Sequence, residues 1–409
     1  MSETGKHSGK VLFVGHEASM TGAPIVLLRF LRWLKENGTP QFRILLGAGG
    51  KLLPDFERLS PVDTFEPETS LWYRGLRRLH LEERRRRNHL DYLCEKLRVE
   101  DIRLIYANTI VTAKLVEFLS FLDCPVVCHV HELEGNISVC GDDNVARMDK
   151  LVCQYIAVSD AVRKNLVELH GIQSRKIQVI PNSVPVEGAF RPDASEAHAA
   201  LCNELGVSQD SRFVCGCGSI EKGKGTDLFL QVAEHVRDGD AGRNVHFIWV
   251  GGKPDAVRSM RRRAEVASLG GIVHFLGLRD DVSRFFRASE VFILTSREES
   301  ASLVILEASL QEIPVVCFDR SGGATEFVNG DVGIVTPPYD TKRMAEAVSF
   351  LLRAPNHRRE LGLKAREKVF QRHRLSLRAT EVRAVIEEVI SRNCSTADRL
   401  TTTYSVIKS

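Results

Sequence analysis

Short apolar runs alternate with helix-like segments along most of the chain, and this alternation constrains the fold more than any other feature. Continuous apolar runs of this length are typical of strands buried on both faces of a parallel sheet. Repeated strand–helix alternation predicts a doubly wound parallel sheet in each half of the chain, an α/β fold. The expected strands are 11–14, 42–46, 104–106, 126–130 and 177–180 in the first half, and 213–217, 245–250, 273–276, 291–294 and 315–318 in the second.

The chain length and one irregular segment predict two domains. With 409 residues the chain is too long for a single hydrophobic core. Residues 181–192 carry little regular pattern and are rich in proline and glycine. We therefore expect an N-terminal domain over residues 1–184 and a second domain over residues 185–375.

The composition is that of an ordinary soluble globular protein, with 43% apolar and 27% charged residues. A net charge of +3 gives no reason to expect a nucleic-acid partner. There is no apolar run long enough to span a membrane, and the first ten residues lack the apolar core of a signal peptide. The ten cysteines form no CxxC pair. These observations predict a cytoplasmic protein with reduced thiols.

Two carboxylates bracket an expected strand-to-helix turn in the second half. Glu299 and Glu307 lie eight positions apart, after the apolar run 291–294 and across a stretch of small and hydroxyl residues. A helix that starts there presents free backbone N–H groups, which favour anions. Two acids around a phosphate-binding helix start suit a ligand that has hydroxyl groups at both ends and phosphates between them. A nucleotide-sugar is such a ligand.

Several motifs resemble those of family 4 retaining glycosyltransferases and follow the order in which they occur in that family. They are Glu-x7-Glu at 299–307, Ile-Pro-Val-Val at 313–316, Ser-Gly-Gly-Ala-Thr-Glu at 321–326, Tyr-Ile-Ala-Val-Ser at 155–159, the segment 177–184 and the segment 218–227. The resemblance implies the GT-B fold, in which two Rossmann-like domains face one another across a cleft. It also implies that a helix within 376–409, for which 377–390 is the candidate, crosses back to the N-terminal domain before a loose tail.

The resemblance implies donor-site roles for residues of the second domain. Lys224 matches the lysine of the Lys-Gly-x-Asp motif and would bind the diphosphate. Glu299 would bind hydroxyls of the donor sugar and influence catalysis, with Glu298 as the alternative if the turn is shifted by one residue. Glu307 would accept hydrogen bonds from the ribose. The backbone amides that would hold the β-phosphate are those of Ser302 and Leu303.

One position departs from the family pattern. Ser219 stands where an arginine often follows the first glycine, so a bidentate phosphate contact is missing. Lys222 or Arg297 would compensate, or donor affinity would be lower.

Two residues of the first domain resemble family positions near the donor and the acceptor. Gly22 lies in the loop after the first strand, before Pro24, where we expect a helix over 24–37 to begin. His131 follows the run 126–130 and matches a histidine close to the donor sugar. His129 lies on the same side of that strand, but with no third ligand at suitable spacing we expect no metal site there.

The other glycosyltransferase architecture holds a metal with Asp-x-Asp, and Asp238-Gly239-Asp240 has that form. The triplet precedes a strand instead of following one, so it is expected to be a turn. We therefore expect no metal and no cofactor other than the nucleotide-sugar. The departing diphosphate would be neutralised by Lys224 and the helix start.

The segment 74–98 carries nine basic residues against four acidic ones. Leucines at 90, 93 and 97 make an apolar stripe along it, and Trp72 with the leucines at 76 and 79 makes another. One interpretation is a charged surface helix that packs by its apolar side. The other is a patch for a membrane surface or an anionic acceptor, which would place the enzyme peripherally at the inner membrane face.

The sequence thus predicts a hexosyltransferase-type, retaining enzyme that moves a sugar from a nucleotide-sugar to a glycan, lipid-linked or small-molecule acceptor, as in polysaccharide biosynthesis. One alternative is a GT-B protein that binds sugar nucleotides with weak or no turnover. Another is a different GT-B activity, an epimerase or a phosphorylase. A dinucleotide-binding oxidoreductase ranks last, because no Gly-x-Gly-x-x-Gly follows the first strand.

Overall fold

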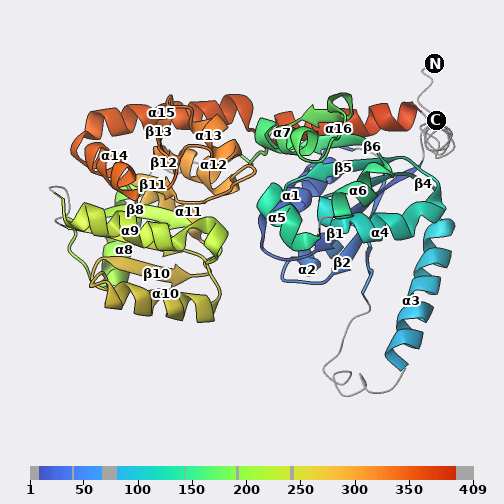
Figure 1. Ribbon diagram of the computed structural model, residues 1–409, viewed down its shortest axis with the longest axis horizontal. Coiled ribbons are helices and arrows are strands. Elements are labelled where there is room, and N and C mark those ends of the chain that lie inside the picture. The colour runs from blue at the N-terminus through green and yellow to red at the C-terminus, as the bar shows by residue number, and fades with distance from the viewer. Residues whose placement is uncertain are drawn as a thin grey trace. The chain divides into compact units, whose positions relative to one another are not determined.

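The chain forms two compact units, each with its own sheet (Figure 1). The structure is a computed structural model that describes residues 9–38, 41–66, 81–141, 143–189, 193–239 and 244–392, with the backbone alone for 81–83. The first unit contains the residues up to Pro181 and those from Ser376 onward, and the second contains Asn182–Leu375. The predicted boundary lies three residues beyond Pro181, at residue 184.

The described strands of the first unit form one parallel sheet of seven strands in the order β3-β2-β1-β4-β5-β6-β7. The expected runs all form strands, and two strands were not expected: β3 and β6. The strands are β1 (Lys10–Glu17), β2 (Phe42–Ala48), β3 (Val62–Thr64), β4 (Ile102–Ala107), β5 (Val126–Val130), β6 (Val152–Ala157) and β7 (Ile177–Val179).

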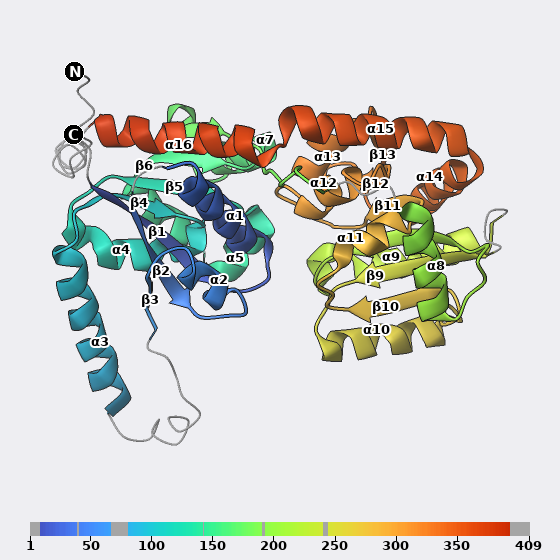
Figure 2. The ribbon, with the colours of Figure 1, turned by 180° about the vertical axis from the view of Figure 1, so that it is seen from behind.

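Helices cover both faces of this sheet, and one of them comes from the far end of the chain (Figures 1 and 2). α16 (Leu375–Ser391) packs in the first unit, where Arg383 lies 5.3 Å from the ring centre of Trp33. Its buried residues are Ala379, Val382, Val385, Ile386 and Val389. The other helices are α1 (Gly22–Glu36), α2 (Leu53–Glu57), α3 (Leu81–Arg98), α4 (Ala113–Phe118), α5 (Glu134–Cys140), α6 (Asp143–Asp149) and α7 (Asp160–Glu168).

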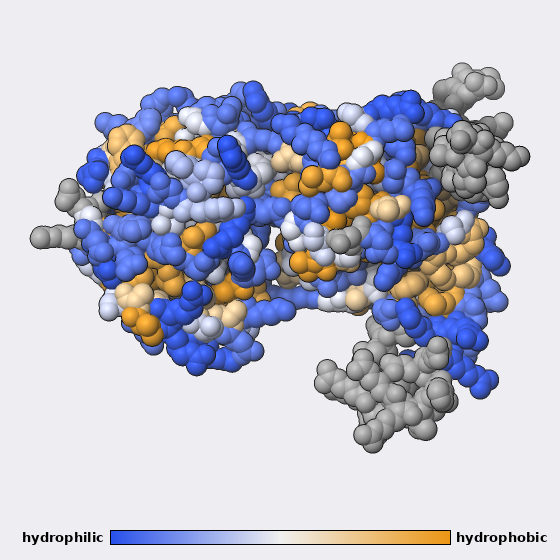
Figure 3. Space-filling model, viewed as in Figure 1, coloured by the Kyte–Doolittle hydropathy of each residue, from blue (hydrophilic) through white to orange (hydrophobic). Residues whose placement is uncertain are grey.

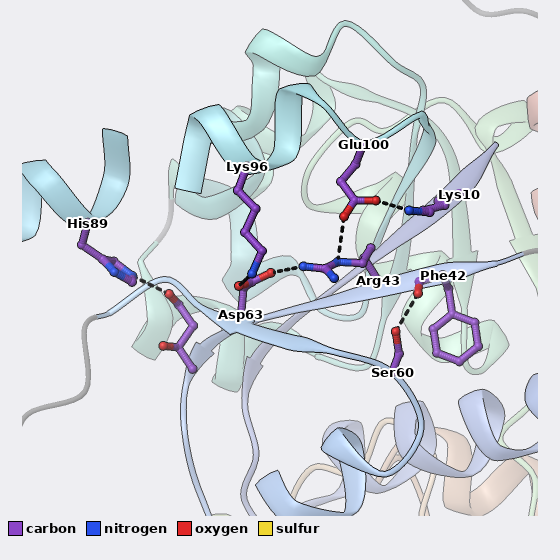
Figure 4. Close-up of polar contacts among 9 residues, drawn as sticks. Lys10, Phe42, Arg43, Ser60, Asp63, His89, Lys96 and Glu100 are labelled. Carbon is purple, nitrogen blue, oxygen red and sulfur yellow. Dashed lines mark hydrogen bonds and ion pairs between the residues drawn. The ribbon is translucent and has the colours of Figure 1, made fainter. Parts of the chain in front are cut away.

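A chain of ion pairs joins the C-terminal half of α3 to the sheet (Figure 4). Lys96 and Arg43 both contact Asp63, at 2.5 and 2.7 Å, and Arg43 also lies 3.6 Å from Glu100, which pairs with Lys10. Arg43 and Asp63 are largely buried, so water screens this pair less than an exposed one. The network fixes α3 at one end.

The leucines of α3 behave as the surface-helix interpretation expects. Leu93 and Leu97 are buried, whereas the four arginines 84–87 are exposed. Figure 3 shows the end of α3 that carries these arginines as a hydrophilic surface. Trp72, Leu76, Leu79 and the basic residues before 81 lie outside the described residues.

The second unit contains a six-stranded parallel sheet in the order β10-β9-β8-β11-β12-β13. All five expected runs form strands, and β13 was not expected. The strands are β8 (Arg212–Cys217), β9 (Val245–Val250), β10 (Val273–Gly277), β11 (Val291–Leu294), β12 (Val315–Phe318) and β13 (Gly333–Thr336). The helices are α8 (Ala194–Leu205), α9 (Thr226–Arg237), α10 (Pro254–Val266), α11 (Val282–Arg287), α12 (Leu303–Ser309), α13 (Gly323–Val328), α14 (Thr341–Arg353) and α15 (Pro355–Arg372).

Both faces of this sheet are buried, as the continuous apolar runs predict. In β8, Phe213 and Cys215 belong to one core cluster and Val214 between them to the other. In β9, Ile248 belongs to the first cluster, and Trp249 to the second. Successive side chains of a strand point to opposite faces, so a run buried on both sides must be apolar throughout.

Each sheet has one point where the strand order reverses direction. In the first unit this point lies between β1 and β4, and in the second between β8 and β11. Ligands of doubly wound sheets bind beyond the carboxyl ends of the strands at such a point. The loops that follow these four strands therefore define where a site is expected in each unit.

Candidate functional site

In the second unit, Lys224 and Glu299 form an ion pair in the two loops that flank the reversal point. Lys224 ends the short helical turn after β8, and Glu299 lies between β11 and α12. Lys224 Nζ is 2.7 Å from Glu299 Oε2, and the Ser296 hydroxyl donates to the same oxygen over 3.1 Å. The side chain of Glu299 is 10% exposed and that of Lys224 is 28% exposed. Two residues predicted separately from motifs therefore meet in one site.

The environment keeps Lys224 charged. Burial acts to lower the pKa of Lys224, but the charge and hydrogen bond of Glu299 oppose it, and the pKa is raised overall. Glu221 acts in the same direction. The ammonium group is therefore cationic at neutral pH.

Backbone contacts fix the position of Glu299. Its N–H donates to the Ser321 carbonyl over 2.6 Å, and its carbonyl accepts from the N–H of Gly323 over 2.9 Å. The side chain that reaches Lys224 is thus that of Glu299 and not that of its neighbour Glu298. Ser296 was not predicted from the sequence, because a buried serine acquires a partner only through the geometry of the turn.

Gly225 allows the two loops to approach closely. A Cβ on Gly225 would lie 2.0 Å from the Thr295 carbonyl oxygen, and its φ of +65° suits glycine. The Thr295 hydroxyl donates to the carbonyl of Lys224 over 3.1 Å. The glycine of the Lys-Gly-x-Asp motif is therefore required by contact between the loops.

Glu307 lies in the second turn of α12, since the helix begins at Leu303 after the N-cap residue Ser302. Burial raises the pKa of Cys217, at the end of β8, to about 12, with the charge of Glu307 adding to this and that of Lys224 opposing it. Glu307 and Lys224 therefore both lie near the end of β8.

Ser219 and Arg297 are held by carboxylates of the same unit. The Ser219 hydroxyl donates to Glu221 over 2.6 Å. Arg297 makes a bidentate contact with Asp227, at 2.9 and 2.7 Å, and donates to the Lys222 carbonyl. The guanidinium that was expected to compensate for Ser219 is thus engaged in tying the two loops together.

In the first unit, three imidazoles lie at the carboxyl end of β1 and β5. The ring centres of His129 and His131 are 4.3 Å apart. The hydroxyl oxygen of Tyr106 lies 2.6 Å from His129 Nδ1. His131 Nε2 and His16 Nδ1 are buried without a hydrogen-bond partner among the described residues. Burial lowers the pKa of His129 to about 3, and burial with the neighbouring imidazoles lowers that of His131 well below its usual value. Both rings are neutral at physiological pH.

Glu132 is a buried carboxylate beside these rings that the sequence analysis did not single out. It accepts hydrogen bonds from the Thr109 hydroxyl and from the N–H groups of His131 and Ile110, at 3.0 and 3.4 Å for the latter two. Burial raises its pKa, and these hydrogen bonds counteract part of the effect. Its contacts fix the backbone at His131.

Gly22 is the first residue of α1, so the helix begins two residues earlier than predicted. Pro24 is then its third residue, which is tolerated because the first four N–H groups have no intrahelical acceptor. A Cβ on Gly22 would meet nothing within 4 Å. The space beside the start of α1, which was predicted to approach a ligand, is therefore not filled by neighbouring atoms of the described chain.

Within the described ranges, no group of three or more histidine, cysteine or carboxylate side chains has the geometry to hold a metal ion. Asp238 follows α9 and pairs with Arg237, and Asp240 lies outside the described residues. The nine cysteines in the described part are all free thiols.

Two family profiles match the chain. One described as "Glycosyltransferase Family 4" matches residues 20–187, and one described as "Glycosyl transferases group 1" matches residues 211–354. The first covers most of the first unit, and the second covers the Lys224–Glu299 pair.

Curated relatives match over part of their length. A D-inositol 3-phosphate glycosyltransferase of Xylanimonas cellulosilytica is 29% identical over 52% of this chain and 53% of its own. An N-acetyl-alpha-D-glucosaminyl L-malate synthase of Bacillus anthracis is 26% identical over 62% of this chain and 66% of its own. The chain thus spans about half to two thirds of the length of these relatives.

A solved structure matches nearly the whole chain. HepE of Anabaena, crystallised with UDP and glucose, covers 93% of this chain and 99% of its own with a TM-score of 0.78 and 21% identity. That likeness shows the fold, two parallel-sheet α/β domains of the GT-B class. The two profiles, which match residues 20–187 and 211–354, show that the chain belongs to the family 4, group 1 glycosyltransferases.

Proposed function

We propose that the protein is a retaining glycosyltransferase that binds a nucleotide-sugar in the loops after β8 and β11. The observation that carries this proposal is the Lys224–Glu299 pair at the point where the strand order reverses. It presents a cation for a diphosphate beside a carboxylate for sugar hydroxyls. The relatives' names describe sugar transfer, which supports the same reaction class.

The proposed roles follow the order of groups in a nucleotide-sugar. Lys224 binds the diphosphate and neutralises it as it departs, with the amides of Ser302 and Leu303 on the β-phosphate. Glu307 accepts hydrogen bonds from the ribose, and Glu299 from the sugar. A charged donor of this kind stabilises the departing group by about 2.7–4 kcal/mol.

We propose that the reaction needs no metal, because Lys224 supplies the charge that a metal would otherwise supply. The Glu299 carboxylate is held by the Lys224 ammonium group and the Ser296 hydroxyl. Retention would follow if the departing phosphate accepts the proton of the acceptor on the same face of the sugar. His131 is the proposed contact to the donor sugar, and Gly22 to the donor phosphates and the acceptor.

The acceptor is proposed to be a small molecule, a glycan or a lipid-linked glycan. Relatives named for inositol 3-phosphate and for L-malate favour a small hydroxylated anion. If the product enters polysaccharide synthesis, the acceptor would instead be a glycan. Turnover with D-inositol 3-phosphate, L-malate and a glycan primer, compared side by side, separates these classes.

A sugar-nucleotide-binding protein with weak turnover is the second candidate. Ser219 favours it, because a hydroxyl held by Glu221 replaces the guanidinium usual at that position. Ser219→Arg should then raise donor affinity. Rapid turnover by the wild type would exclude this candidate.

We propose that the exposed arginines of α3 contact an anionic membrane surface on the cytoplasmic side. No helix in the described part of the chain is long and apolar enough to cross a membrane. The ion pair of Lys96 with Asp63 holds one end of α3. Residues 84–87 are exposed at the other end, where Arg86 pairs with Glu66 at 3.2 Å. Binding to phosphatidylserine vesicles should fall with added salt and with replacement of Arg84 and Arg87 by glutamine. Equal pelleting with neutral and anionic vesicles would contradict it.

The proposed function is tested by thermal shift of the wild type and Glu307→Ala with UDP, GDP, ADP and their common sugar conjugates. A ligand at a hundred times its Kd stabilises the protein by about 2.7 kcal/mol. One nucleotide should stabilise the wild type strongly and the variant much less. If none stabilises the wild type and no sugar is transferred, the proposal is wrong.

A further inference from the structure

Two cations of the candidate donor site are already neutralised by carboxylates of the same unit. Lys224 faces Glu299 at 2.7 Å, and Arg297 faces Asp227 through a bidentate contact. Glu221 adds a further negative charge that acts on Lys224. A phosphate ligand must therefore compete with Glu299 for the ammonium group instead of meeting an uncompensated charge.

We propose that Glu299 is the counter-ion of Lys224 in the ligand-free protein and that this makes the site select a complete nucleotide-sugar over a free diphosphate. The inference rests on the proposed function and assigns Glu299 a role in specificity. A diphosphate that reaches Lys224 displaces the carboxylate from its cation. The carboxylate then needs new hydrogen-bond donors, and the hydroxyls of an attached sugar supply them.

A free nucleoside diphosphate lacks those hydroxyls and carries more charge. Its terminal phosphate takes an additional negative charge above a pKa of about 6, which is absent when a sugar esterifies that phosphate. This charge would lie beside Glu299. Like charges in a partly buried site repel more strongly than in water. The same repulsion would help the nucleoside diphosphate to leave after transfer.

The contacts of Glu299 show why it cannot simply turn away. Its backbone is held on both sides, by Ser321 and Gly323. Within the described chain, Ser296 and Lys224 both contact Oε2, and Oε1 accepts from neither. Oε1 can therefore receive a sugar hydroxyl while Ser296 keeps the carboxylate in place. Ser296 is in this sense a positioning residue.

Calorimetric titration of wild type and Glu299→Gln with inorganic pyrophosphate tests the counter-ion role without depending on the base. The substitution keeps the size of the side chain and removes its charge. Pyrophosphate should bind Glu299→Gln at least about fivefold more tightly. Glu299→Ala is a second variant that should give the same gain. In Lys224→Ala/Glu299→Gln the gain should disappear, since it acts through the ammonium group.

Selectivity is tested with three pairs of ligands: UDP and UDP-glucose, GDP and GDP-mannose, ADP and ADP-glucose. For the pair that binds, Glu299→Gln should bind the nucleoside diphosphate more tightly than the wild type does, and the sugar conjugate equally or more weakly. The ratio of the two dissociation constants should therefore shift about tenfold. Glu298→Gln is the matched control, with the same loss of charge one residue away, and should shift neither ligand by more than about twofold.

Three results would overturn the inference: no gain for pyrophosphate, an equal gain for the nucleoside diphosphate and its conjugate, or the same gain in Glu298→Gln. Failure of the proposed function would look different. If no nucleotide binds any of the proteins, the donor site is wrong as a nucleotide site. Pyrophosphate would then still decide whether Glu299 masks the charge of Lys224.

Discussion

At the scale of single residues, side chains predicted separately from motifs meet in the structure, but their pairing was not predicted. Lys224 and Glu299 are 75 positions apart and were assigned to the diphosphate and to the sugar. The sequence could not show that they touch, because contact depends on how closely the loops approach. Ser296 and Glu132 were missed for a related reason: their partners come from turn geometry that residue types do not encode.

Loss of Lys224 should affect turnover far more than stability. Lys224→Ala removes the cation proposed to stabilise the departing diphosphate, so kcat/KM should fall at least about a hundredfold. Steady-state kinetics with the nucleotide-sugar found by thermal shift measures this. Lys364→Ala, which breaks an exposed pair with Glu360, is the control and should stay within about twofold of wild type. A folded Lys224→Ala enzyme with normal rates would remove this residue from the site.

Buried His129 should make the protein less stable in acid. Burial lowers its folded pKa to about 3, below the usual value of 6.5, so the unfolded chain binds the proton more readily. Its stabilising contribution is complete above about pH 6.5 and is lost as pH falls toward 3, by about 1 kcal/mol per pH unit near pH 5–6. Urea unfolding at pH 5, 6 and 7 should show a shallower pH dependence for His129→Gln. Identical slopes for both proteins would mean that His129 titrates alike when folded and unfolded.

At the scale of elements, the prediction succeeded for the mainly apolar runs and for the short β7, and it missed three strands that are short or carry a polar residue or glycine. The ten expected runs all form strands, as β8 and β9 illustrate. β3 is three residues long with Asp63 at its centre, Gln154 interrupts β6, and β13 begins with Gly333. Short or interrupted strands form because they pair with neighbouring strands of the sheet, and the local sequence does not show this pairing.

The conformation of the loop between β8 and α9 depends on Gly225 but not on Gly223. In Gly225→Ala a Cβ would overlap the Thr295 carbonyl and face a positive φ, so we expect a loss of about 2 kcal/mol or more, with loss of donor binding. Gly223→Ala, two residues earlier, meets nothing within 4 Å and should be nearly neutral. Urea unfolding and thermal shift compare the two. Equal stability of the variants would contradict the close approach of the loops.

At the scale of the whole molecule, the chain does not divide into two consecutive pieces. The first unit takes its last helix, α16, from beyond the second unit. The GT-B resemblance, not the residue pattern, suggested this return, because an amphipathic helix does not reveal which sheet it packs on. Its buried face and the Arg383–Trp33 contact now assign it to the first unit.

A charge on the buried face of α16 should therefore loosen the first unit selectively. In Ile386→Asp an unpaired carboxylate replaces a side chain that is 2% exposed, which should cost several kcal/mol in the unit where it packs. Ala384→Asp places the same group on the exposed side of the helix and is the matched control. Hydrogen exchange should rise in β1, β4 and β5 for Ile386→Asp and stay unchanged in β8, β9 and β11, while Ala384→Asp resembles wild type. Nucleotide stabilisation of the second unit should survive, because Lys224, Glu299 and Glu307 all belong to it. Equal acceleration in both sheets would show that the two units unfold as one, and acceleration in the second sheet alone would mean that α16 is assigned to the wrong unit.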